Sequence, residues 1–230
     1  MTSESHPLAG LDARTTLQAA IGAVAAYAAQ RYGLKATIPD TYEYDVIRAA
    51  YTDTLFEAFI GYASSGGAVT KWKNAAKRAI VEAFPDAFNR AHEEAGADET
   101  DDDDEKWLTG RMNEELGHLD GVFAWLKQAR GEETITETDI EARVEQWAQG
   151  LDSVFSEALL RAKKNQSLEW HLGETEIHCE TCARLNGQRH TAKWYLARDY
   201  IPGKPGAAMD CGGWRCLCFL TDKSGETVTI

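Results

Sequence analysis

The chain has 230 residues and a formal net charge of −13, with 43% hydrophobic and 27% charged residues, an ordinary composition for a globular protein. No apolar run approaches the roughly 18 residues that a membrane span needs, so we expect no membrane partner. The opening residues, MTSESHPLAG, lack the basic and apolar segments of a secretory signal. We therefore expect a protein made in a reducing cytoplasm, where disulfides rarely persist.

Charge is unevenly distributed along the chain. Residues 1–160 carry a net charge of −15, whereas residues 161–220 carry +3. An acidic surface repels phosphate, so the first part is not expected to bind nucleic acid. The contrast predicts two modules, a helical body over residues 1–165 and a small module over residues 166–230.

The first part has apolar residues at helical spacing. The expected helices span residues 15–32, 41–62, 69–96, 105–129 and 137–163. Pro85 lies inside the third and predicts a kink or a restart there, because proline removes a backbone donor and clashes with the preceding turn. Tryptophans of this part are interpreted as core or interface residues: Trp72, Trp107, Trp125 and Trp147.

The run ADETDDDDE, residues 97–105, is dense in negative charge. Like charges at this density resist compaction, so we expect an exposed loop. A divalent-ion site is the alternative, but the spacing lacks the glycine and the terminal carboxylate of a calcium loop.

After Asn165 the long apolar stripes end. The short segments SLEWHL, AKWYLA and WRCLCFL are predicted to be strands, and IPGKPG is too rich in glycine and proline for a helix. The predicted fold class is therefore mainly α, with a helical N-terminal body followed by a small α+β module. A module of about 65 residues is near the lower limit for a self-sufficient hydrophobic core. A disulfide or a structural metal ion would therefore add to its stability.

All five cysteines lie in this small module, as Cys179 and Cys182 in a C-x2-C pair and Cys211, Cys216 and Cys218 in a C-x4-C-x-C cluster. A C-x2-C turn presents two thiolates from one knuckle, which suits tetrahedral zinc with Zn–S distances of about 2.3 Å. The second cluster supplies the other knuckle. We therefore predict a closed, structural zinc site rather than a catalytic one.

The choice of the fourth ligand depends on the expected strand WRCLCFL. There Cys216 and Cys218 would share one face at a separation of about 6–7 Å, which is long for two sulfurs on one ion. Cys216 is nearer the glycine turn, in which Gly212 and Gly213 permit positive φ. This favours Cys216 as the ligand and leaves Cys218 as a buried thiol or a substitute ligand.

Other uses of the cysteines stay open. Two disulfides with one free thiol rank second, and a thioredoxin-like centre at CETC ranks third because a strand–helix context is missing. His171 and His178 are possible substitute ligands, and His190 has no evident companion. A metal-dependent hydrolase with an open site at His178 is a further alternative. The sequence has no Walker loop, HExxH or nucleophile elbow, so we expect no enzyme activity.

The C-terminal stretch resembles phage head-morphogenesis proteins, the Mu F-like minor capsid group. The residues that match the family pattern in order are Trp170, Cys179, Cys182, Leu185, Gly187, Pro202, Cys211, Cys216 and Cys218. Many members end in His-Pro-x-Cys-x-Cys, whereas this chain has CGGWRCLC, so Cys211 stands where the family has histidine. The resemblance covers about fifty residues.

The resemblance implies a virion or prohead component of low copy number with a role in head assembly or at the portal vertex. Its partners would be portal and capsid proteins, with packaged DNA and an oligomer in the virion as further options. The alternative function is a zinc-ribbon nucleic-acid-binding or DNA-packaging accessory protein. Basic and aromatic residues interleave as that function requires: Arg184, Arg189, Lys193, Trp194, Tyr195, Arg198, Trp214 and Arg215.

Overall fold

The structure, a computed structural model, describes residues 42–65, 67–97, 100–132, 134–175, 177–213 and 216–228. These residues belong to one compact unit, Thr41–Ile230. The helix expected over residues 15–32 lies outside the described residues. As predicted, the described part of the chain is mainly helical, with a small three-stranded sheet and the cysteine cluster near its C-terminal end.

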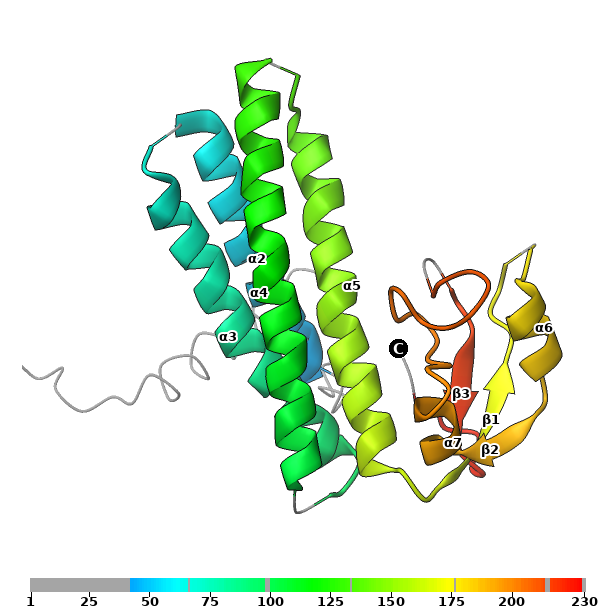
Figure 1. The fold of residues 1–230 in the computed structure, drawn as a ribbon. Helices are drawn as coiled ribbons and strands as arrows, with labels where there is room; N and C mark the ends of the chain where they lie inside the picture. Colours follow the sequence, from blue (N-terminus) through cyan, green and yellow to red (C-terminus); the bar gives the residue numbers. More distant parts are fainter. Residues whose placement is uncertain are drawn as a thin grey trace, which may run out of the picture. The chain divides into compact units, whose positions relative to one another are not determined.

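The long helices are α2 (Tyr42–Ser65), α3 (Val69–Glu94), α4 (Asp102–Gly131) and α5 (Glu137–Ala162). They lie side by side as a bundle (Figure 1), because each has an apolar stripe that it buries against its neighbours. Trp147 is buried, and Trp72, Trp107 and Trp125 pack against the core, as predicted. Among the largest fully buried side chains are Tyr51, Leu55, Phe59, Ile80, Phe84, Leu119, Leu126, Ile140, Leu151 and Leu160.

Pro85 does not end α3. The helix continues unbroken through the proline to Glu94, so of the predicted kink or restart the restart is wrong. Proline costs the helix a hydrogen bond, but tertiary packing supplies most helical stability in proteins. Phe84 is fully buried just before the proline and Phe88 is buried just after it, so both halves of the helix are fixed by the same core.

The acidic run over residues 97–105 is only partly the exposed loop that its charge predicts, because α4 begins inside it at Asp102. The Asp101 carboxylate accepts hydrogen bonds from the backbone N–H groups of Asp103 at 3.1 Å and Asp104 at 3.0 Å. Asp104 is buried, and its carboxylate accepts a 2.6 Å hydrogen bond from Arg161 Nε of α5. Negative charge is stabilised at a helix N-terminus, so these residues start the helix that they were expected to precede.

The C-terminal part contains an antiparallel sheet in the order β2-β1-β3. Strand β1 (Ser167–His171) lies between β2 (Arg189–Thr191) and β3 (Phe219–Thr221), and the short helices α6 (Glu180–Leu185) and α7 (Ala192–Leu196) complete the module. The segment SLEWHL forms β1, as predicted.

The segment AKWYLA forms α7 and not the expected strand. The Thr191 hydroxyl caps this helix by accepting a 3.3 Å hydrogen bond from the Trp194 backbone N–H. Ala192 and Tyr195 are the buried residues, and their spacing is that of one helix face. In so short a segment the cap and this spacing outweigh the β propensity of Trp and Tyr.

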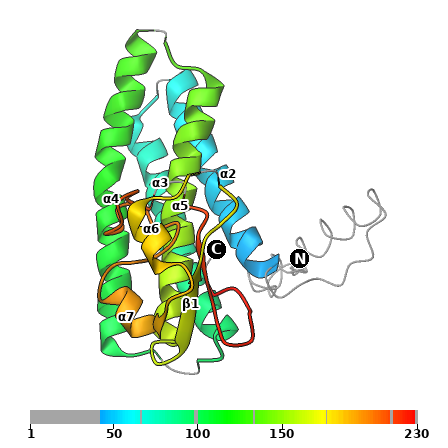
Figure 2. The same ribbon diagram turned by 90° about the vertical axis from the view of Figure 1, so that its right-hand side faces the viewer.

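The small module packs against α5. Helix α7 lies against α5 (Figure 2), and the apolar side chains of both parts form one hydrophobic cluster. Lys204 is largely buried and forms ion pairs with Glu157 of α5 at 3.0 Å and with Asp199 at 2.7 Å. Because buried charges need partners, these contacts fix the loop before the second cysteine cluster to the bundle.

Candidate metal centre

The five cysteines are free thiols that come together from the two sequence clusters. Their sulfur atoms form two groups of three, and within each group all sulfurs lie within 4.8 Å of one another. One group is Cys179, Cys182 and Cys211, and the other is Cys182, Cys216 and Cys218. Cys182 belongs to both, and its Sγ lies 3.8 Å from that of Cys216. Sulfurs on one tetrahedral zinc lie about 3.8 Å apart, so this set of donors can hold a metal ion.

The first knuckle is held in place by hydrogen bonds. Cys179 is the N-cap of α6, and its Sγ accepts a 3.4 Å hydrogen bond from the Cys182 backbone N–H. The backbone N–H and hydroxyl of Thr181 both donate to Oδ2 of Asp210, each at 2.7 Å. These hydrogen bonds hold the pKa of Asp210 below its ordinary value. Asp210 directly precedes Cys211, so this side chain joins the two knuckles.

The second knuckle is a glycine turn, as predicted. Gly212 and Gly213 have φ values of 59° and 73°. The Gly212 carbonyl accepts a 2.8 Å hydrogen bond from the Gly206 N–H, and the Gly213 carbonyl accepts one of 3.2 Å from the Cys216 N–H. A Cβ at Gly213 would lie 1.8 Å from the Lys204 carbonyl oxygen. Glycine at 213 therefore lets the turn approach the loop that Lys204 anchors on α5.

We expect Gly213→Ala to lower the free energy of unfolding by about 2 kcal/mol, through the strained φ and the contact with the Lys204 carbonyl. Gly225→Ala is the matched control, since Gly225 also has positive φ, 85°, but a Cβ there meets nothing within 4 Å. Urea denaturation of both variants separates the two causes. Equal losses would mean that the close approach contributes nothing.

Cys216 and Cys218 do not lie in the expected strand. Of the segment WRCLCFL, β3 includes only Phe219 and Leu220, and the cysteine thiols come within 4.8 Å of each other instead of the expected separation of about 6–7 Å. A Cβ at Gly173 would lie 1.9 Å from the Leu217 carbonyl oxygen, so the backbones touch here. The geometric reason for treating Cys218 as a spare thiol is therefore wrong.

The surroundings of the thiols shift their pKa values in opposite directions. Burial raises the pKa of Cys182, and a hydrogen bond with Cys218 together with burial raises the pKa of Cys216. Burial also opposes ionisation of Cys179, but hydrogen bonds with Cys182 and Cys211 outweigh it and lower its pKa. The hydrogen bond with Cys216 lowers the pKa of Cys218. Each group of three sulfurs thus contains one thiol whose pKa lies below its ordinary value.

The histidines have distinct surroundings. His178 Nδ1 lies 4.0 Å from Cys218 Sγ and 3.2 Å from the Thr175 hydroxyl, at the edge of the cluster. His171 Nε2 lies 2.9 Å from the Thr221 hydroxyl across the sheet, and His171 belongs to neither cysteine group. His190 stacks on Trp194 with ring centroids 3.6 Å apart, which supplies the companion that the sequence did not reveal.

Basic side chains of the module are exposed at Arg184, Arg189, Lys193 and Arg198. The ring of Trp194 is already covered by His190 and by Arg198, whose guanidinium carbon lies 4.1 Å from the ring centroid. Tyr195 is buried. These aromatic rings are therefore not free to stack on nucleic-acid bases, and Trp214 and Arg215 lie outside the described residues.

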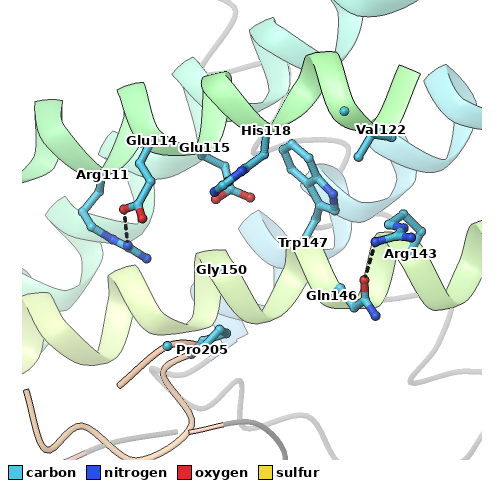
Figure 3. Close-up of a pocket in the computed structure, with 12 residues that line it drawn as sticks. Arg111, Glu114, Glu115, His118, Val122, Arg143, Gln146, Trp147, Gly150 and Pro205 are labelled. Carbon is cyan, nitrogen blue, oxygen red and sulfur yellow. Dashed lines mark hydrogen bonds and ion pairs between the residues drawn. The ribbon is translucent and has the colours of Figure 1, made fainter. Parts of the chain in front are cut away.

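A separate cavity of about 480 Å³ lies between α4, α5 and the turn at Pro205 and Gly206. Figure 3 shows Glu115 and His118 projecting from α4 beside Trp147 of α5. Burial raises the pKa of Glu115 to about 7. The full lining is Arg111, Glu114, Glu115, His118, Gly121, Val122, Arg143, Gln146, Trp147, Gly150, Pro205 and Gly206.

Glu115 was not among the residues that the sequence singled out. It lies between Met112 and Leu119, at helical spacing from both, and so on the apolar stripe of α4. A carboxylate on such a stripe is the signal that could have revealed it. A Cβ at Gly150 would lie 3.3 Å from Glu115 Oε1, so the glycine on α5 makes room for the carboxyl group.

Comparisons with known proteins found no match to a family model, to a curated protein or to a solved structure. None of the helices in the described part of the chain is long and apolar enough to cross a membrane. The geometry of the thiols is therefore the firmest guide to function.

Proposed function

We propose that this chain is a structural protein of a phage head, a minor capsid or head-morphogenesis component near the portal, with a structural zinc site. The observation that supports the proposal is the convergence of the five thiols in the cysteine order that resembles Mu F-like proteins. Its place would be the virion, after synthesis in the host cytoplasm. Its role is assembly and not catalysis.

Zinc is the metal that the donor set favours. Thiolates are soft ligands that select zinc over magnesium or calcium, and zinc needs no redox partner. A site closed by thiolates holds the fold and leaves no position for a substrate. The module around it is small, and its sheet has strands of only three to five residues. A bound metal ion would therefore supply folding stability that so small a core does not provide by itself.

The surface beside the metal site supports a docking role. Ile177, next to His178, is 87% exposed, and Leu217, between the last two cysteines, is 58% exposed. Large apolar side chains held exposed by a rigid site are suited to contact another protein. In this proposal the metal fixes the loops that present these side chains to a portal or capsid subunit.

Proteomics of purified particles tests the proposal. We expect to detect the chain in proheads, in mature virions or in both. Its copy number should be low relative to that of the major capsid protein of the same particles. A host cytoplasmic protein serves as the contamination control. Absence of the chain from both kinds of particle would contradict the proposed role in the head.

A further inference from the structure

The arrangement of the sulfurs differs from that of a site for one ion. One tetrahedral zinc with four cysteines would bring all four sulfurs within about 3.8 Å of one another. In the described residues the thiols instead form two groups of three, with Cys182 as the shared member. Neither group contains a fourth sulfur within 4.8 Å of all its members.

Each group is fixed by its own contacts. The Asp210 carboxylate, through its hydrogen bonds to Thr181, holds Cys211 close to the Cys179–Cys182 knuckle. The backbone of Gly173 closely approaches the Leu217 carbonyl, and this approach positions the loop that carries Cys216 and Cys218. The two groups are therefore positioned by different contacts.

We propose that the module holds two zinc ions that share the Cys182 thiolate. One ion is bound by Cys179, Cys182 and Cys211, and the other by Cys182, Cys216 and Cys218. This inference rests on the proposed metal-binding function and extends it from one ion to two. All of the cysteines are then ligands, including the one that a single-ion site leaves over.

The net charge of the centre and the number of available ligands both favour two ions. Five thiolates and two Zn²⁺ ions leave the centre with a charge of −1, whereas one ion with four thiolates carries −2 beside an unused thiol. The second ion needs a fourth ligand, and we assign it to His178, whose Nδ1 lies 4.0 Å from Cys218 Sγ. The first group supplies three thiolates, and its ion would take a fourth ligand from outside this group.

Metal analysis of the full chain, purified under reducing conditions and saturated with Zn²⁺, tests the number of ions. We expect about two per chain by elemental analysis and by native mass spectrometry. Cadmium-113 NMR of the Cd²⁺-loaded chain should give two resonances. About one ion per chain with a single resonance would overturn the two-ion centre but keep the proposed zinc function, whereas no bound metal would remove both.

Single substitutions locate the shared ligand. Cys179→Ser and Cys218→Ser should each retain about one ion, whereas Cys182→Ser should lose both, because it removes a ligand from each ion. A Cys218→Ser variant that keeps all of its metal would identify Cys218 as a spare thiol and overturn the proposal. Circular dichroism checks that each variant is folded, and the unsubstituted chain decides the count if a variant is not.

Discussion

Removal of metal from the purified protein should unfold the C-terminal module and leave the helices α2–α5 folded. The module clusters five thiols in and around its core, with Cys182 and Cys218 buried, and without a cation those that ionise repel one another. Binding of structural zinc supplies folding free energy, so we expect the module to lose more than about 5 kcal/mol on chelation. The bundle keeps its own buried stripes from α2 to α5.

Hydrogen exchange measured with and without a chelator resolves the two parts. We expect the amides of β1 and α6 to lose protection on chelation, while those in the middle of α3 and α5 exchange as before. Re-addition of Zn²⁺ under reducing conditions is the control and should restore protection. Unchanged exchange at β1 and α6 would show that the module does not depend on metal.

The sequence predicts the bundle well because its helices repeat the same signal over many residues. Apolar stripes of six or more turns, as on α5, leave few alternatives, and Ile140, Leu151 and Leu159, which recur at helical spacing, are all buried. Local signals of five or six residues are weaker. AKWYLA has β propensity, yet a cap at Thr191 and the burial of Tyr195 make it a helix.

The metal site also has features that the sequence predicts and features that it does not. Clustering of the cysteines and the glycine turn follow from residue spacing, so the knuckles at Cys179–Cys182 and Gly212–Gly213 could be predicted. Asp210 and Gly173 act through contacts with residues about 30 and 44 positions away, Thr181 and Leu217, and no local pattern encodes such contacts. The two groups of sulfurs are likewise a property of the folded loops.

Replacement of Glu115 by glutamine should stabilise the protein at alkaline pH. Burial, only partly offset by Arg111, raises the pKa of Glu115 from 4.5 in the unfolded chain to about 7 in the folded protein. Between these values the folded state holds the proton more tightly, so the stability of the natural protein falls as pH rises from 4.5 through 7. Glutamine stays neutral, and we expect a gain of about 2–3 kcal/mol at pH 8 and little change at pH 4.5.

Urea denaturation from pH 4.5 to 8.5 measures this difference. Glu141→Gln on the exposed face of α5 is the matched control, because it removes the same charge at a solvated position. The Tyr51 hydroxyl is buried without a hydrogen-bond partner among the described residues, and burial together with the charge of Glu115 raises its pKa. Stability curves of the natural protein and Glu115→Gln that run parallel over this pH range would contradict the assignment, whereas curves that diverge only above pH 5 would place the cost of burial on this carboxylate.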